Sequence, residues 1–311
     1  MEKYEISVIV PSYNSYMTIE KCIDSLLNQD FEAEYEIIVV DSSRDAKTVE
    51  TLRNLPSQVK VYHSDRRLNA GQARNLGVEV SNGKILAFID SDCIAPKDWL
   101  RKIKNYFDVY PQICGVYGVY SGGCTLIEKI TGGEFLEKHE IGFYGGFIEG
   151  NCAFKREVFD NGCRWSETVR SQYVGLAKCI NTKIKKPVLW SSELKVIHLG
   201  RVGLKKIFKS GMSKFNEDKK SLNLAIRSFA FSLLLLSGIL SLPSLSIVPQ
   251  KEIGLLLFIL PNLVFAYYIA KDKMISFKYK ILLFPYLVWI RWVFWLGWIF
   301  AAISTLFKKI I

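Results

Sequence analysis

The N-terminal part of the chain alternates short apolar runs with segments whose apolar positions recur at helical spacing. The apolar runs are rich in β-branched residues and predict buried strands over residues 6–10, 36–40, 59–62 and 85–89. The helical spacing predicts amphipathic helices over residues 18–28, 46–54 and 70–80. Such alternation is typical of an α/β domain in which helices flank a mostly parallel sheet.

Three polar loops directly follow predicted strands, after Val10, after Val40 and after Ile89. In a parallel sheet the loops at the carboxyl ends of the strands lie on one side, and ligands bind there. We therefore expect these three loops to converge on one side of the sheet.

The hydrophobic pattern continues less regularly beyond these units. It predicts strands over residues 147–154 and 188–198 and a helix over residues 168–180. Residues 202–215 place Leu204, Ile207, Phe208 and Phe215 on one face and lysines elsewhere. This pattern fits either an interfacial amphipathic helix or a surface helix packed on the core, and the apolar region that follows favours the interfacial position.

Long apolar stretches dominate the C-terminal part of the chain, over residues 224–248, 253–270 and 281–307. Each is long enough to span a bilayer, which takes about 17 residues or more. The lysine-rich linker 271–280 is expected in the cytosol together with the N-terminal domain, as the positive-inside rule requires. Arg291 stands among tryptophans in the third stretch. Two spans are therefore predicted, and the third stretch either crosses or lies in the interface.

Charge and cysteine content refine this picture. The formal net charge is +11, but six lysines gather within residues 205–220, just before the apolar region, which favours anionic lipid headgroups over nucleic acid. The seven cysteines form no Cys-x-x-Cys pair, so we expect reduced thiols, with neither a zinc site nor a disulfide framework. The polar start and the short apolar run 6–10 do not resemble a cleavable signal peptide, so the N-terminal domain is expected on the cytosolic face.

Two carboxylates, Asp90 and Asp92, stand one residue apart directly after a predicted buried strand. Placed there, they can bind a hard divalent cation that also holds a diphosphate, and oxygen ligands suit Mg²⁺ or Mn²⁺. Such a cation neutralises the charge that grows on a departing nucleoside diphosphate. The alternative is a solvated turn, which is the usual origin of an isolated Asp-x-Asp pattern.

Four motifs in this order resemble those of family 2 glycosyltransferases. They are SVIVPSYN at residues 7–14, IIVVDSS at 37–43, NAGQARNLG at 69–77 and FIDSD at 88–92. The resemblance weakens at GNCAF, residues 150–154, and is vague beyond residue 200. It implies the A-type glycosyltransferase fold, a nucleotide-sugar donor and inversion at the anomeric carbon. Together with the apolar pattern, it divides the chain into a catalytic domain over residues 1–200, an amphipathic linker over 201–223 and a membrane region over 224–311.

Carried over by position, the resemblance places Pro11, Tyr13 and Asn14 beside the nucleoside. It gives Asp41 a hydrogen bond to the base and sets Arg74 near the donor. The alternative for Asp41 is a helix cap or turn former, and for Arg74 a surface ion pair.

Further along the chain, the resemblance lets His198 complete a metal site with Asp90 and Asp92. A packed or solvated histidine is the alternative.

The family's acidic pair at the start of a helix, whose Asp is the general base, is missing. Gln172 and Tyr173 occupy its place, and residues 168–192 contain no acid. Glu167 is the first substitute and Glu149 the second. A polyprenyl phosphate acceptor, which is already anionic, would need no base at all, and this acceptor explains the missing acid and the membrane region together.

The sequence therefore predicts a metal-dependent glycosyltransferase that acts on a membrane lipid or lipid-linked acceptor in polysaccharide or glycolipid biosynthesis. The alternative is a non-catalytic, nucleotide-sugar-binding membrane subunit, which the missing acid would also explain. A dinucleotide-dependent oxidoreductase is disfavoured because no Gly-x-Gly-x-x-Gly follows the first strand.

Overall fold

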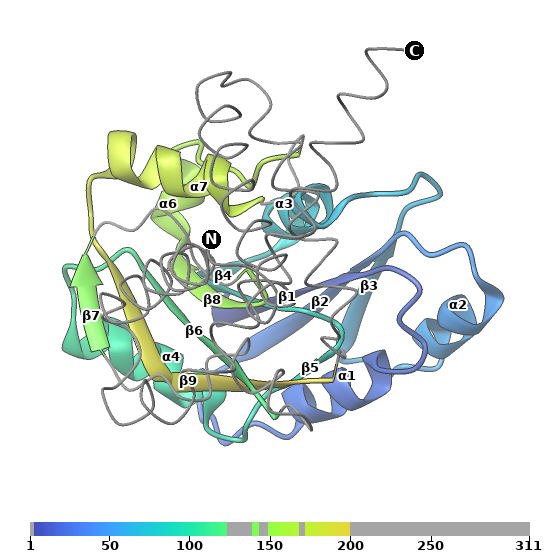
Figure 1. Ribbon diagram of the computed structural model, residues 1–311. Helices are drawn as coiled ribbons and strands as arrows, with labels where there is room; N and C mark the ends of the chain where they lie inside the picture. Colours follow the sequence, from blue (N-terminus) through green and yellow to red (C-terminus); the bar gives the residue numbers. More distant parts are fainter. Residues whose placement is uncertain (1–2, 123–138, 143–148, 168–171, 200–311) are drawn as a thin grey trace, which may run out of the picture. The chain divides into compact units, whose positions relative to one another are not determined.

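The computed structural model describes residues 3–122, 139–142, 149–167 and 172–199, which form a sheet covered by helices (Figure 1). The strands are β1 (Tyr4–Ser12), β2 (Tyr35–Asp41), β3 (Val59–His63), β4 (Gly83–Ile89), β5 (Cys93–Ile94), β6 (Gly115–Ser121), β7 (His139–Gly142), β8 (Asn151–Lys155) and β9 (Val188–His198). The helices are α1 (Ile19–Leu27), α2 (Ala46–Arg53), α3 (Ala70–Val80), α4 (Trp99–Val109), α6 (Arg156–Asp160) and α7 (Tyr173–Cys179), and the π-helix η1 (Ile180–Ile184) continues α7.

The sheet has the order β3-β2-β1-β4-β8-β6-β9-β5, with β7 paired to β9. The first four strands are parallel, which confirms the α/β prediction for this half. The prediction of a mostly parallel sheet is wrong for the other half, where β8 runs antiparallel to both β4 and β6. A parallel neighbour needs a crossover that returns the chain to the starting end. Instead, β8 enters beside the end of β4, with Asn151 opposite Ile89.

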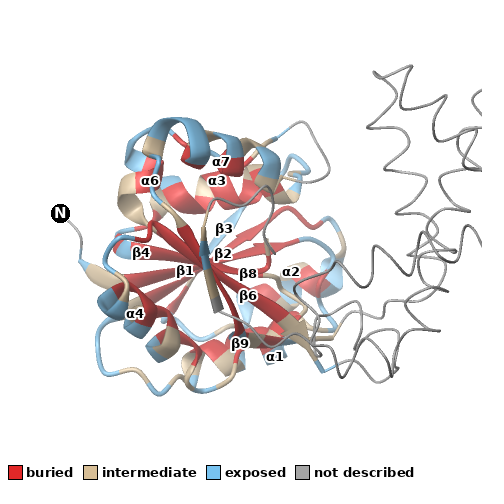
Figure 2. Ribbon diagram, turned by 60° about the vertical axis from the view of Figure 1, so that its left-hand side comes forward, coloured by how far each residue is buried: buried red, intermediate tan, exposed pale blue. Residues whose placement is uncertain are grey.

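Each face of the sheet is covered by its own set of helices, as the burial colours of Figure 2 show. On one face Ile6, Val8 and Val10 of β1 pack with α1 and α4. On the other face Ile9 of β1 and Phe88 of β4 pack with α3, α6 and α7. The two faces of β1 therefore contribute to both cores, which is why Val8, Ile9 and Val10 are apolar in succession.

Most predicted elements lie where the pattern placed them. The bounds of α3 and β9 coincide with the predicted ranges 70–80 and 188–198, and β1, β2, β4 and α1 differ by one or two residues. The predicted strand 147–154 starts later, at Asn151, and the predicted helix 168–180 is described only from Tyr173. No element was predicted between residues 93 and 146, where β5, α4, β6 and β7 lie, nor for α6.

The expectation of reduced thiols without a disulfide is wrong for one pair of cysteines. Cys163, after α6, forms a disulfide with Cys179, the last residue of α7. Sixteen positions separate the two cysteines, and only the packing of α7 beside the end of α6 brings them together. The described cysteines Cys22, Cys93, Cys114 and Cys152 are free and buried.

No helix among the described residues is both long and apolar enough to cross a bilayer. The predicted amphipathic segment 202–215 and the apolar stretches within 224–311 lie outside these residues.

Candidate functional site

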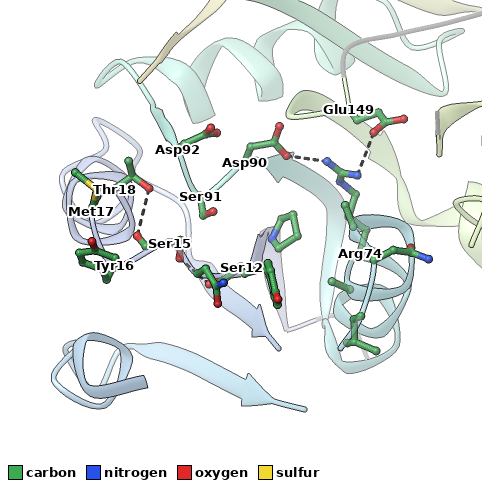
Figure 3. A pocket seen from close by; sticks show the side chains of 17 residues that line it. Ser12, Ser15, Tyr16, Met17, Thr18, Arg74, Asp90, Ser91, Asp92 and Glu149 are labelled. Carbon is green, nitrogen blue, oxygen red and sulfur yellow. Dashed lines mark hydrogen bonds and ion pairs between the residues drawn. The ribbon is translucent and has the colours of Figure 1, made fainter. Parts of the chain in front are cut away.

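A cleft of about 570 Å³ opens at the carboxyl ends of β1 and β4, beside the start of α3 (Figure 3). It is lined by Pro11, Ser12, Tyr13, Asn14, Ser15, Tyr16, Met17, Thr18, Leu68, Asn69, Ala70, Ala73, Arg74, Asp90, Ser91, Asp92 and Glu149. The loop after β2 joins the loop after β1, because the backbone N–H of Asn14 donates to Ser43 Oγ at 2.7 Å. The predicted convergence of the three polar loops is confirmed.

The residues expected beside a nucleoside form one wall of this cleft. Pro11, Tyr13 and Asn14 all line it, and the backbone of Asn14 has a positive φ of 52°, which asparagine tolerates better than most residues. The Tyr13 ring is partly exposed, with the Arg67 guanidinium carbon 4.6 Å from its centroid. A flat aromatic surface is thus available at this wall.

Asp41, expected to meet the base, is fully buried and does not line the cleft. Its Oδ1 accepts hydrogen bonds from the hydroxyls of Ser12 and Ser43, and its Oδ2 accepts one from the Ser43 N–H and lies 2.9 Å from His63 Nδ1. The helix that follows is capped by Asp45 rather than by Asp41. In this structure Asp41 therefore ties the loops after β1 and β2 together.

Arg74 is a buried ion-pair residue rather than a surface one. Its Nη2 donates to Asp90 Oδ1 at 2.7 Å, and its Nη1 lies 3.3 Å from Glu149 Oε2. The guanidinium carbon lies 5.1 Å from the ring centre of Trp165. Burial disfavours the charge, yet Asp90 and Glu149 raise the pKa of Arg74, so it stays a cation.

Both oxygens of Asp90 have partners within the fold. Oδ1 binds Arg74, and Oδ2 accepts from the Tyr120 hydroxyl at 2.9 Å. Burial and the neighbouring Asp90 raise the pKa of Tyr120, which keeps this hydroxyl protonated as a donor. Tyr120 was missed in the sequence because its strand, β6, was not predicted.

Asp92 and His198 meet at the edge of the cleft. The antiparallel pairing of β5 with β9 sets Cys93 opposite His198, and the Leu199 N–H donates to the Asp92 carbonyl at 2.7 Å. The pairing brings His198 Nε2 to 3.4 Å from Asp92 Oδ2. The structure therefore unites two of the three residues predicted as metal ligands, while Asp90 faces Arg74 and Tyr120.

The two glutamates considered as bases lie in different surroundings. Glu149 lines the cleft, and its Oε1 accepts from the Tyr173 N–H at 2.8 Å. Burial raises the pKa of Glu149, against the opposing effects of Arg74 and the Tyr173 N–H. Glu167 does not line the cleft, and its Oε1 accepts from Asn75 Nδ2 at 2.8 Å.

Comparison with known proteins places these features in a family. The sequence model of glycosyl transferase family 2 matches residues 7–162, which is half of the chain. The chain belongs to this family.

Curated relatives match over part of their length. The chain is 36% identical over 154 residues to the Escherichia coli UDP-Glc:alpha-D-GlcNAc-diphosphoundecaprenol beta-1,3-glucosyltransferase WfgD, covering 46% of this chain and 59% of that protein. It is 35% identical over 101 residues to the glycosyltransferase AglE of Haloferax volcanii, covering 31% of this chain and 33% of that protein. The chain thus spans between a third and three fifths of the length of these two relatives.

Among solved structures, the mannosyltransferase PcManGT from Pyrobaculum calidifontis in complex with GDP-Man and Mn²⁺ shares the fold. Its TM-score is 0.52 at 18% sequence identity, over 70% of this chain and 65% of that one. A second structure, GalNAc-T7 with UDP, GalNAc and Mn²⁺, has a TM-score of 0.51 over 64% of this chain and 44% of that one, also at 18% identity. The mixed α/β sheet with its helices therefore has the A-type glycosyltransferase fold.

Proposed function

We propose that this protein is an inverting glycosyltransferase that moves a sugar from a nucleotide-sugar donor to a membrane lipid or lipid-linked acceptor. The observation that carries the proposal is the pairing of Asp92 with His198 at the edge of a cleft whose other wall holds Tyr13 and Asn14. One wall suits a nucleoside, and the Asp92 side suits a cation-bound diphosphate.

The Asp92 and His198 side chains fit a divalent cation. Two ligands in adjacent positions around an ion with bonds of about 2.1 Å lie about 3 Å apart, close to the 3.4 Å between these two atoms. Carboxylate and imidazole together suit Mn²⁺, and Mg²⁺ suits the carboxylate. The ligand atoms of Asp92, Cys93 and His198 lie within 4.8 Å of one another, and Mg²⁺ or Mn²⁺ favours the carboxylate oxygen of Asp92 over the soft sulfur of the buried Cys93.

When bound, the cation would neutralise charge on the departing nucleoside diphosphate. Asp92 and His198 would hold the cation at the edge of the cleft. Asp90 has a different role, since its two oxygens position Arg74 and Tyr120. Tyr13 and Asn14 would orient the nucleoside, and Asp41 would fix the loop that carries them through its bond to Ser12.

The class of acceptor is proposed from the acceptors of similar proteins. WfgD is named as a glucosyltransferase that acts on a sugar on diphosphoundecaprenol, and a Methanococcus voltae relative, 28% identical over 165 residues, is named for a dolichyl phosphate-linked sugar. A membrane region over residues 224–311, with the catalytic domain on the cytosolic face, would bring such an acceptor to the cleft. This region lies outside the described residues and is proposed from its apolar sequence alone.

The test is a screen of common nucleotide sugars for donor hydrolysis and for binding by calorimetry, with the full chain in detergent and Mn²⁺ or Mg²⁺ present. We expect one donor class to bind only with the cation and to be turned over. Asp92→Ala should abolish both the binding and the turnover.

Unchanged nucleoside diphosphate affinity in Asp92→Ala with Mn²⁺ present would refute the cation site. Binding without turnover on any acceptor would favour the non-catalytic subunit.

A further inference from the structure

The start of α7, where the family places its acidic pair, carries Gln172 and Tyr173, yet a carboxylate still stands beside it. That carboxylate belongs to Glu149, on the loop ahead of β8. We infer that Glu149 is the general base of the transfer and that the acceptor presents a hydroxyl group to it. The inference rests on the proposed transferase function.

The antiparallel entry of β8 puts Glu149 in this position. Ile89 pairs with Asn151, so the residues just before Asn151 lie beside those just after Ile89. Gly150 fits there only as glycine, because a Cβ would collide with the Asp90 carboxylate and the Tyr120 hydroxyl. Because Gly150 packs closely against Asp90, the preceding residue Glu149 lies at the cleft next to Arg74 (Figure 3).

The Glu149 carboxylate is oriented by its neighbours and remains able to accept a proton. Oε1 receives the Tyr173 N–H at 2.8 Å, and Oε2 faces Arg74 Nη1 at 3.3 Å. A carboxylate offers about four acceptor positions, and the N–H groups of Tyr173 and Gln172 together with Arg74 use three of them, so one remains for an incoming hydroxyl. The side chain is 19% exposed and lines the cleft. It is thus held in place and reachable from the donor site.

The other carboxylates near the cleft have different tasks. Of the described residues that line it, Asp90, Asp92 and Glu149 are the acids. Asp90 is bound at both oxygens, and Asp92 stands beside His198. Glu167, outside the lining, anchors the start of α3 through its backbone oxygen, which accepts from Asn69 Nδ2 at 2.6 Å. Glu149 is therefore the acid left for the acceptor.

The step balances with these groups alone. The acceptor hydroxyl gives its proton to Glu149 as its oxygen forms the new bond to the anomeric carbon. The bond from that carbon to the diphosphate breaks, and its electron pair stays on the phosphate oxygen. A phosphate acceptor has no such proton to lose at neutral pH. The base thus predicts a lipid-linked saccharide hydroxyl as acceptor rather than a bare polyprenyl phosphate.

The test compares Glu149→Gln with the wild-type chain, with Glu167→Gln as the rival base, and with Glu157→Gln at an exposed surface pair as the matched control. Initial rates are measured on the donor found by screening, with water, an undecaprenyl diphosphate-linked monosaccharide or undecaprenyl phosphate as acceptor. We expect Glu149→Gln to lower kcat by roughly 10²–10⁴-fold. The donor KM and the Mn²⁺-dependent affinity for the nucleoside diphosphate should stay the same, and Glu149→Asp should recover part of the rate. Glu167→Gln should lower kcat less than Glu149→Gln does, and Glu157→Gln, outside the cleft lining, should stay within about threefold of wild type.

A lower rate in Glu149→Gln is not expected to come from a loss of folding stability. Burial disfavours the charged form of Glu149, and glutamine resembles the neutral form, so the melting midpoint of Glu149→Gln should not fall. A kcat within about threefold of wild type in this variant would overturn the base assignment and leave the transferase intact. A parallel loss of nucleotide affinity would make Glu149 a donor-binding residue instead. Transfer to undecaprenyl phosphate alone would overturn the hydroxyl acceptor. A wild-type chain that neither binds nor hydrolyses any donor would refute the proposed function itself.

Discussion

At the scale of single residues, the site depends on the buried guanidinium of Arg74, which lies between the carboxylates of Asp90 and Glu149. Arg74 is 2% exposed, and Asp90 and Glu149 would face each other as like charges without it. A buried pair is weak evidence for stability as a whole, but removing one partner leaves the other charge uncompensated. Arg74 thus positions both acids and offsets the repulsion between them.

Arg74→Leu should destabilise the domain by about 3–5 kcal/mol, because two partly buried carboxylates lose their counter-charge. Chemical denaturation followed by circular dichroism measures this change. Arg101→Leu is the matched control, since the exposed Arg101 pairs with an equally exposed Asp30 at 3.4 Å, and its loss should leave the midpoint unchanged. Equal effects in the two variants would contradict the positioning role of Arg74.

His198→Ala should weaken Mn²⁺-dependent binding of a nucleoside diphosphate by about tenfold or more, because a cation held by Asp92 and His198 would lose one of these two ligands. Calorimetry with and without Mn²⁺ measures the change. His63→Ala is the comparison, since His63 contacts Asp41 and does not line the cleft. A metal-independent loss in His198→Ala would indicate that the histidine serves packing alone.

The pH dependence of kcat should show an acidic limb at higher pH than an ordinary glutamate gives. Burial raises the pKa of Glu149, and Asp90 adds to this, while Arg74 and the N–H groups of Gln172 and Tyr173 oppose it. A base works when ionised, so the rate rises as pH passes upward through this pKa. Glu149→Gln should remove the limb. A limb that persists in this variant would assign the titration to another group.

At the scale of elements, sequence pattern predicted the parallel half of the sheet, and in the mixed half it predicted β9 and most of β8 but neither β5, β6 and β7 nor the antiparallel direction of β8. Each β-α unit up to β4 carries its own hydrophobic period, so local pattern suffices there. The α4 helix also shows this period, with Trp99, Ile103 and Tyr106 buried, and counting it would have revealed the helix. The antiparallel entry of β8 depends on pairing with a strand far away in sequence.

The same distinction explains what could be predicted of the site. Asp90 and Asp92 follow a strand directly, so their position at the cleft was readable from the sequence. Placing His198 beside Asp92 needed the β5–β9 register. Choosing Glu149 over Glu167 needed the position of Arg74, because the pattern puts Glu149 in the predicted strand 147–154 and Glu167 just before the predicted helix 168–180 without showing which of them reaches the cleft.

The Cys163–Cys179 disulfide should stabilise the region that holds α7. A closed loop of this length contributes about 3 kcal/mol in the chain-entropy account. Adding a phosphine reductant should therefore lower the melting midpoint of the wild-type chain by roughly 5–12 °C. The Cys163→Ser/Cys179→Ser double variant should melt lower from the start and not respond to the reductant. Identical responses of the two proteins would show that the bond does not contribute to stability.

At the scale of the whole molecule, the chain divides into a unit that contains the described residues and a second unit made mostly of residues 201–311. We expect the second unit to lie in the membrane. A cysteine placed at Gln250 should react with an impermeant reagent added outside intact cells, and one placed at Asp272 should react only after permeabilisation. The wild-type chain, with its native cysteines, gives the background. The reverse pattern would contradict a cytosolic catalytic domain.

The separation of Asp92 from His198 along the chain also constrains how the protein is made. About a hundred residues lie between them, which a ribosome adds in roughly 5–20 s at about 5–20 residues per second. During that interval the parallel strands β1 to β4 can pair, while Asp92 has no histidine beside it and β6 lacks its partner β9. The half-finished sheet presents an open strand edge to its surroundings. The nascent chain is therefore most prone to aggregate, and most in need of a chaperone, in the seconds before β9 emerges.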